Sequence, residues 1–112
     1  MSQFTVYKNK NSRSKATFPL LVDVQADLLD ELETRVVIPL TKAPAFSRKP
    51  INRLTPAIEV DGKTYLMITP QLAGIARSEL GAVVDSVAEQ RPAVIAALDL
   101  LVGCELRVRG SN

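Results

Sequence analysis

The pair Asp61-Gly62 constrains this chain more than any other short feature of its sequence. Two strand-like runs, Ala57–Val60 and Lys63–Ile68, flank the pair. Glycine accepts a positive φ angle without steric cost, so Asp-Gly between such runs is typical of a hairpin with a type I′ turn. The sequence therefore predicts antiparallel β-structure over residues 57–68.

Other apolar runs extend this β-structure in both directions. Gln3–Tyr7, Leu20–Val24 and Val36–Leu40 are rich in β-branched, aromatic or other apolar residues, and each predicts a strand. Pro39 cannot donate to a strand ladder, so we expect the third run to end there or to lie at an edge. A further short strand is predicted over Gln71–Ala76.

The hydrophobic period changes after Ser86. Ser86 and Glu89 have the spacing of a capping box. Pro92 leaves two alternatives: a helix that is already under way and bends at Pro92, or a helix that begins near Arg91 with proline in its first turn. Gly103 is the predicted end. The apolar residues at helical spacing are Val87, Val94, Ile95, Leu98, Leu101 and Val102.

Antiparallel strands followed by one helix indicate an α+β fold. The 112 residues (12.2 kDa) fit a single compact domain. We assign residues 1–104 to that domain and residues 105–112 to a basic C-terminal tail, a candidate for disorder.

Composition excludes several classes of active site. The chain has no histidine and one cysteine, Cys104, which removes Ser/His and Cys/His catalysis, His-ligated metals and internal disulfides. Its five glycines are scattered and form no phosphate-binding loop. We therefore expect no catalytic residue, no metal and no cofactor.

Charge and hydropathy argue against nucleic acid and membrane as direct partners. The net charge is +2, from 14 basic and 12 acidic residues, which is too balanced for nucleic-acid binding by electrostatics alone. The chain start has no apolar signal region, and no apolar run approaches the length of a membrane span. We expect a cytoplasmic protein.

Residues 20–40 contain two apolar runs around an acidic middle. Leu28, Leu29 and Leu32 are interspersed with acids, and two interpretations stay open. Exposed leucines between carboxylates resemble a protein interface, apolar at its centre and charged at its rim. Alternatively, the leucines form a helical turn that packs on the core. The acids are Asp23, Asp27, Asp30, Glu31 and Glu33.

Two polar, basic segments, Lys8–Thr17 and Lys42–Arg53, lack any hydrophobic period. They predict mobile surface loops. Such loops are either solvated connections or a surface for an acidic partner.

In their order and spacing, several segments resemble the CcdB family of toxins from bacterial toxin–antitoxin pairs. The resemblance covers nearly the whole chain. The segments are QFTVY (3–7), LVDVQADLLD (21–30), RVVIPL (35–40), LTPAIEV (54–60), MIT (67–69) and VIAALDLL (94–101).

The resemblance implies a small SH3-like antiparallel β-barrel or sheet with a C-terminal helix, and a symmetric homodimer. Val94, Leu98 and Leu101 would then lie near the two-fold axis. The protein would bind the A subunit of DNA gyrase and trap the complex with cleaved DNA, so it would be a poison and not an enzyme. A CcdA-like antitoxin would neutralise it through a disordered segment that folds on binding. Operator DNA would be reached only through the antitoxin, which links the pair to transcription repression and plasmid maintenance.

The resemblance also assigns residues to the gyrase surface, at the chain start, the acidic turn and the helix end. The two basic loops are expected to bind the antitoxin. The gyrase-binding residues are Gln3, Phe4, Ala26, Leu28, Leu29, Asp99, Val102 and Gly103. The antitoxin-binding residues are Lys8, Lys10, Arg13, Lys15, Lys42, Arg48 and Lys49.

The helix end departs from the family pattern. Gly103, Cys104 and Glu105 stand where the best-known member has Trp-Gly-Ile, and this chain has no tryptophan. Aromatic side chains are common interface anchors. Two alternatives therefore stay open: a MazF-like endoribonuclease, or a non-toxic homologue that only binds antitoxin. The endoribonuclease candidates are Arg13, Arg35, Arg48, Arg53 and Thr69.

Overall fold

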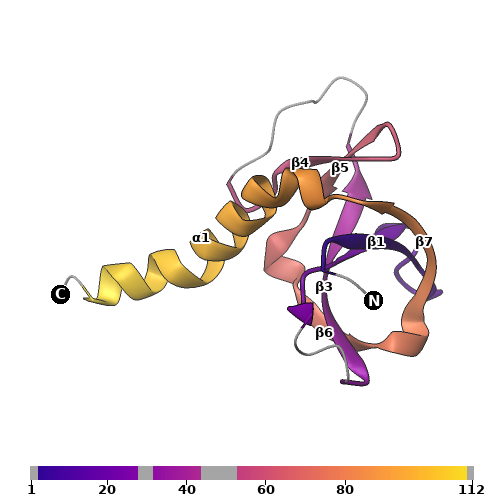
Figure 1. The fold of residues 1–112 in the computed structure, drawn as a ribbon, viewed down its shortest axis with the longest axis horizontal. Coiled ribbons are helices and arrows are strands. Elements are labelled where there is room, and N and C mark those ends of the chain that lie inside the picture. Colours follow the sequence, from indigo (N-terminus) through magenta and orange to yellow (C-terminus); the bar gives the residue numbers. More distant parts are fainter. Residues whose placement is uncertain (1–2, 28–31, 44–52, 111–112) are drawn as a thin grey trace.

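In the part of the chain that the structure describes, seven β-strands form one curled antiparallel sheet and a long helix follows them (Figure 1). The computed structural model describes residues 3–27, 32–43 and 53–110, with residues 104–110 as backbone only. The predicted α+β class, a small antiparallel sheet with a C-terminal helix, is confirmed. The elements are β1 (Thr5–Asn9), β2 (Leu20–Asp23), β3 (Thr34–Lys42), β4 (Ala57–Val60), β5 (Lys63–Met67), η2 (Thr69–Gln71), β6 (Ala73–Ala76), η3 (Arg77–Glu79), β7 (Leu80–Ser86), η4 (Ala88–Gln90) and α1 (Arg91–Gly110).

The sheet follows the order β4-β5-β3-β2-β1-β7, and β6 pairs with β3 outside this path. The predicted hairpin joins β4 to β5, with Val60 opposite Lys63. Asp61 has φ 51° and Gly62 has φ 79°. Positive φ at both central residues is the requirement of a type I′ turn, so the prediction for Asp61-Gly62 is confirmed.

The first strand lies two residues later than predicted. Phe4 has φ 70°, which interrupts the extended backbone, so β1 begins at Thr5 and continues through Asn9. Positive φ is uncommon for a residue with a side chain. The sequence gives no sign of it, because a bulky aromatic residue normally favours the strand.

The long strand β3 is central to the sheet, and the prediction that Pro39 ends it or marks an edge is wrong. Pro39 lies inside β3, opposite Leu21 of β2. On the other side of β3, Val37 is the last residue paired with β6 and Leu40 the first paired with β5. The N and O atoms of one strand residue point to the same neighbour. The Pro39 carbonyl accepts from Ile68 N (3.0 Å), on the side of β3 that pairs with β6 and β5. The N–H that proline lacks would therefore point to the gap between β6 and β5, where the ladder has no partner for it.

Strand β7 was not predicted from the sequence. It pairs with β1 through an irregular register and brings the far edge of the sheet toward β4. Side chains rather than a backbone ladder join these edges. Asp85 Oδ2 accepts from Asp61 N (2.8 Å), while Gln90 accepts from Glu59 N (2.8 Å) and donates to Glu59 O (2.7 Å). The sheet thus curls into a half-barrel.

The helix resolves the ambiguity at Pro92. Helix α1 begins at Arg91 and holds Pro92 in its first turn, where the missing N–H would have no partner in the helix. Ser86 does not cap α1; its Oγ accepts from Ala88 N (3.3 Å) at the start of η4. The predicted end at Gly103 is wrong, because α1 continues to Gly110.

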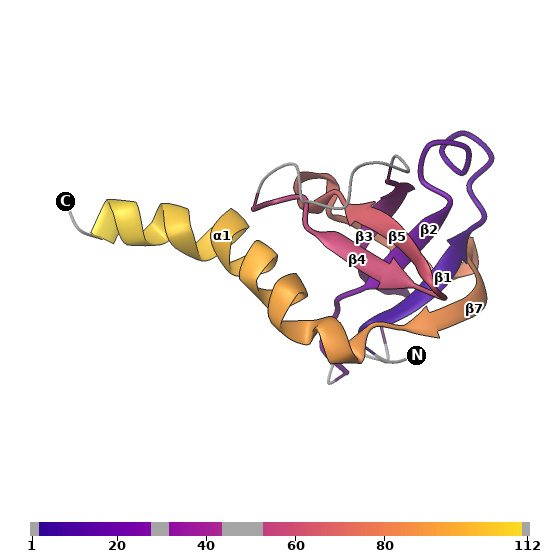
Figure 2. The same ribbon diagram turned by 90° about the horizontal axis from the view of Figure 1, so that it is seen from above.

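The main core fills the inside of the curled sheet. Val94 and Ala97, in the first half of α1, are buried there with residues of β1 to β5. Both views show α1 leading away from the sheet, with its C-terminal half far from the strands (Figures 1 and 2). Val94 is fully buried within its own chain, whereas Leu98 and Leu101 are partly exposed. The position of these residues near a two-fold axis stays a prediction.

Candidate partner-binding surfaces

The chain start and the turn after β2 lie together, and we call Gln3, Phe4 and residues 24–27 the turn cluster. Gln3 N donates to Asp27 Oδ1 (2.8 Å), and Gln3 Nε2 donates to Val24 O (3.1 Å). Phe4 N donates to Asp23 O (2.6 Å). Ala26 and Asp27 are exposed. The structure thus brings together three of the predicted gyrase-binding residues, Gln3, Phe4 and Ala26.

Phe4 is a buried member of the turn cluster. Its side chain is only 4% exposed, and the guanidinium of Arg91 lies over its ring, 5.7 Å from the centroid. Its carbonyl accepts from Val87 N (2.9 Å). The Phe4 backbone, with its positive φ angle, therefore connects the turn after β2 to the segment that leads into α1. Its ring is buried beneath the exposed residues of the turn cluster.

A charged pair is buried beneath the turn cluster. Arg35 donates a hydrogen bond from Nε to Asp23 Oδ2 (2.8 Å), and Arg35 Nη2 forms an ion pair with the same oxygen at 2.7 Å. Both side chains are 0% exposed. Asp23 Oδ1 accepts from Gln25 N (2.9 Å). Gln25 Oε1 in turn accepts from Val36 N (3.0 Å). One carboxylate thus connects a β3 arginine to the first residue of the turn.

Burial raises the pKa of the Asp23 carboxyl above its ordinary value of 3.8. Hydrogen bonds from Arg35 and Gln25, together with the charge of Arg35, oppose this rise in pKa. Asp23 is thus a buried acid, unlike Asp27 and Glu33, which are exposed. In the sequence, the apolar residues on both sides of Asp23 in LLVDV (20–24) were the sign that Asp23 is buried.

The α1 residues predicted to bind gyrase, Asp99, Val102 and Gly103, lie in the middle of α1 and not beside the turn cluster in a single chain. Asp99 and Val102 are exposed, Val102 by 57%, and Gly103 is half-buried. Their segment of α1 leads away from the sheet (Figure 2). Leu28 and Leu29 lie outside the described residues. Leu32 is 49% exposed, which argues against the interpretation that this leucine packs on the core.

The first basic segment is a turn with defined hydrogen bonds. The carboxamide of Asn9 donates to Ser14 Oγ (3.0 Å) and Phe18 O (2.8 Å), and its oxygen accepts from Asn11 N (2.9 Å). Asn11 Oδ1 accepts from Arg13 N (2.9 Å). These bonds link Asn9, at the start of the segment, with residues 11, 14 and 18. Lys8, Lys10, Arg13 and Lys15 are all exposed on it.

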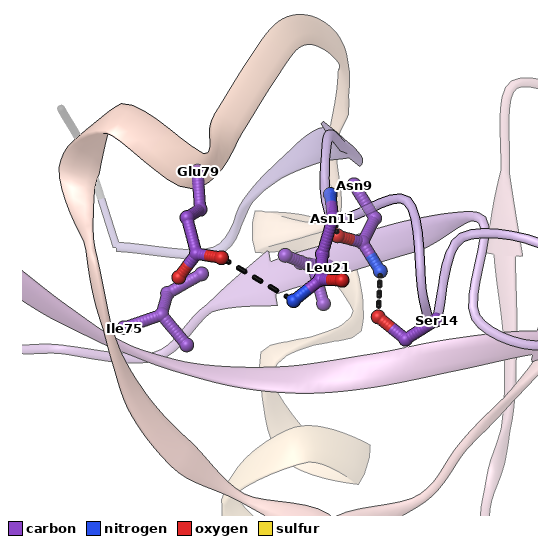
Figure 3. Close-up of a pocket in the computed structure, with 6 residues that line it drawn as sticks. All are labelled: Asn9, Asn11, Ser14, Leu21, Ile75 and Glu79. Atoms are coloured by element: carbon purple, nitrogen blue, oxygen red, sulfur yellow. Dashed lines mark hydrogen bonds between the residues drawn. The ribbon is translucent and has the colours of Figure 1, made fainter.

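A small cavity lies between this segment and the β6–β7 region (Figure 3). Asn11 Nδ2 donates across it to Glu79 Oε1 (3.3 Å). Lys10 N also donates to Glu79 O (3.2 Å). The basic segment is therefore fastened to η3. In the second basic segment, Lys42 is exposed, whereas Arg48 and Lys49 lie outside the described residues.

The residues considered for ribonuclease chemistry do not share an exposed face. Arg35 and Thr69 are fully buried, and Arg35 is paired with Asp23. Arg13 and Arg53 are exposed, and Arg48 lies outside the described residues. Within residues 3–27, 32–43 and 53–110, no three acidic or cysteine side chains are grouped as metal ligands.

Comparison with known proteins decides the family. The family model described as CcdB protein matches residues 3–103, nearly the whole chain. The chain belongs to the CcdB family. This membership places it among the toxins of toxin–antitoxin pairs.

A solved structure has the same fold as this CcdB-family chain. It is described as an endoribonuclease in complex with its cognate antitoxin from Mycobacterial species. The TM-score is 0.73 at 14% identity, over 92% of this chain and 95% of the other. At this identity the likeness establishes the fold alone. Among the described residues of the CcdB-family chain, none of the helices is long and apolar enough to cross a membrane.

Proposed function

We propose that this chain is a toxin that binds the A subunit of DNA gyrase and holds gyrase on cleaved DNA. The observation that carries the proposal is the family match over residues 3–103. In this proposal the chain acts by binding, catalyses no reaction itself and works in the cytoplasm, where gyrase and DNA are found.

The proposed gyrase surface combines the turn cluster with the middle of α1, at residues 99–103. Gln3 and Ala26 are accessible in the first region, and Asp99 and Val102 in the second. Phe4 supports the first region from below. Leu28, Leu29 and Gly103 complete the proposed set.

The proposal includes a symmetric dimer. Beyond the core-facing residues Val94 and Ala97, α1 leaves Leu98 and Leu101 half-exposed and Val102 more exposed still. A second copy would cover this apolar face, and two-fold symmetry presents the same patch on both chains. It would also place two copies of residues 99–103 and two turn clusters in one assembly.

The proposed antitoxin contact lies on the basic segments. Lys8, Lys10, Arg13 and Lys15 project from a turn that is already formed, so a disordered acidic segment would meet a prepared surface. Opposite charges at exposed rims mainly raise association rates, and salt screens them. We assign Lys42, Arg48 and Lys49 to the same contact.

The likeness to an endoribonuclease structure makes a ribonuclease the second candidate. The burial of Arg35 and Thr69 argues against it, because a catalytic group must reach the substrate. The third candidate binds antitoxin without toxicity, and the departure from the family pattern at Gly103-Cys104-Glu105 favours it.

Expression in two bacterial hosts separates the candidates. One host carries ordinary gyrase, and the other carries a gyrase A variant that resists poisons of this family. Killing of the first host alone supports gyrase as the target. Killing of both hosts with cleaved transcripts supports the ribonuclease, and survival of both with antitoxin retained in a pull-down supports the third candidate.

A further inference from the structure

We propose that Gln25 is a positioning residue that opens the last rung of the β2–β3 ladder, and so sets the direction in which Ala26 and Asp27 are presented to the partner. The proposal rests on the function proposed above, because it concerns the same surface. It adds a residue that the gyrase-binding set does not contain.

The strand register shows where the β2–β3 ladder ends. Asp23 lies opposite Val37, so the next rung pairs Val24 with Val36. In an antiparallel ladder alternate pairs exchange two backbone hydrogen bonds, and Val24 with Val36 is one of these pairs. The first is present, from Val24 N to Val36 O (2.9 Å). Two glutamine side chains take the place of the second.

In place of a bond from Val36 N to Val24 O, each of these two backbone groups bonds to a glutamine side chain. Gln25 Oε1 accepts from Val36 N (3.0 Å), and Gln3 Nε2 donates to Val24 O (3.1 Å). Both backbone groups therefore keep a partner while the chain turns out of the sheet. An unsatisfied backbone donor at this position would destabilise the fold, so the turn depends on a side-chain acceptor there.

The buried ion pair holds Gln25 in place. Asp23 Oδ2 binds Arg35, which leaves Oδ1 to accept from Gln25 N (2.9 Å). The Gln25 side chain is itself only 5% exposed. Residues 20–25 are all buried, and Ala26 and Asp27 are the first exposed residues of the segment. The exit direction is therefore determined by Asp23 and Gln25 on one side and Gln3 on the other.

The test replaces Gln25 with methionine, which has a similar length but no strong acceptor. In Gln25→Met we expect Val36 N to lose its side-chain partner and the turn to change conformation. Affinity for a gyrase A fragment should fall about tenfold, the equivalent of one hydrogen bond. NMR should detect shifted amide signals for Ala26 and Asp27 and faster hydrogen exchange at Val36.

The matched control is Ile58→Val, a core change in β4 that also lowers stability. If Gln25 only stabilised the fold, Gln25→Met and Ile58→Val would lose the same affinity for the gyrase A fragment once their stabilities are matched. Equal losses of affinity would therefore overturn the proposal. Unchanged turn amides in Gln25→Met would overturn it as well. A wild-type chain that does not bind the fragment refutes the proposed function instead, and the NMR result then still decides whether Gln25 sets the turn.

Discussion

Asp23 and Arg35 carry opposite charges that solvent does not reach. Such a pair contributes little net stability, because the cost of removing two charges from water offsets their attraction. Removal of one partner is different, since it leaves the other charge buried and alone.

We therefore expect Arg35→Met to lower the free energy of unfolding by about 3–5 kcal/mol. Urea denaturation at pH 7 measures this loss. The control is Arg53→Met, at an exposed arginine, where the change should stay within about 0.5 kcal/mol. Equal effects in the two variants would contradict the buried pair.

Asp85 provides a pH-dependent link between the edges of the sheet. Hydrogen bonds from Asp61 N and Ser86 N lower the pKa of its carboxyl below the ordinary value of 3.8. A lowered pKa in the folded state means that the contribution to stability is present above pH 3.8 and lost as the pH falls through the folded pKa.

We expect wild type to be more stable than Asp85→Asn at pH 7, because the asparagine amide cannot accept both hydrogen bonds. The difference should shrink below pH 3.8 as Asp85 is protonated. Thermal unfolding of both proteins between pH 2 and pH 7 measures it. Asp23 is present in both proteins, so the effect of its raised pKa on stability cancels from the difference between them. A difference that is constant with pH would refute the role of the carboxylate.

At the scale of elements, the close contact between β7 and β1 depends on Gly81. A Cβ atom at Gly81 would lie 2.9 Å from the backbone oxygen of Lys8 and 3.1 Å from its Cβ. At Gly74 in β6, a Cβ would meet nothing within 4 Å.

These two glycines form a matched pair for one prediction. Gly81→Ala should destabilise the protein by about 1–3 kcal/mol through overpacking. Gly74→Ala should be neutral or stabilise by up to about 1 kcal/mol, because alanine restricts the unfolded chain. Chemical denaturation of both variants decides the matter, and a larger loss at Gly74 would contradict the packing of β7 on β1.

The elements that the sequence could predict are those with a local cause. Asp61-Gly62 defines its hairpin through backbone freedom alone, and Pro92 suits the first turn of α1 for a similarly local reason. Strand β7 escaped prediction because its identity as a strand depends on pairing with β1, far away in sequence. Pro39 misled for the same reason: its tolerance inside β3 depends on where β6 and β5 meet that strand.

In the candidate site, too, some residues could be predicted from the sequence and others could not. A family resemblance pointed to Gln3, Phe4 and Ala26, and the structure brings these residues together. The Asp23–Arg35 pair and the role of Gln25 could not be predicted, because residues 12 positions apart meet only once β2 pairs with β3.

At the scale of the whole molecule, we propose that a second copy covers the apolar residues Leu98, Leu101 and Val102 of α1. We expect a dimer in solution and a monomer in Val102→Asp, since the substitution places a charge on both sides of a symmetric contact. Sedimentation at micromolar concentration measures the mass, and circular dichroism checks that the variant folds. A wild-type chain that sediments as a monomer would contradict the proposed dimer.

The central claim is that the chain traps gyrase on cleaved DNA, and the most direct measurement is the cleavage complex itself. Purified gyrase, supercoiled plasmid and increasing amounts of the chain are incubated, and the reaction is then stopped with detergent and protease. We expect linear DNA to increase with the chain and to disappear when antitoxin is added first. Plasmid that is never linearised, from a chain that is folded and binds antitoxin, would contradict the claim.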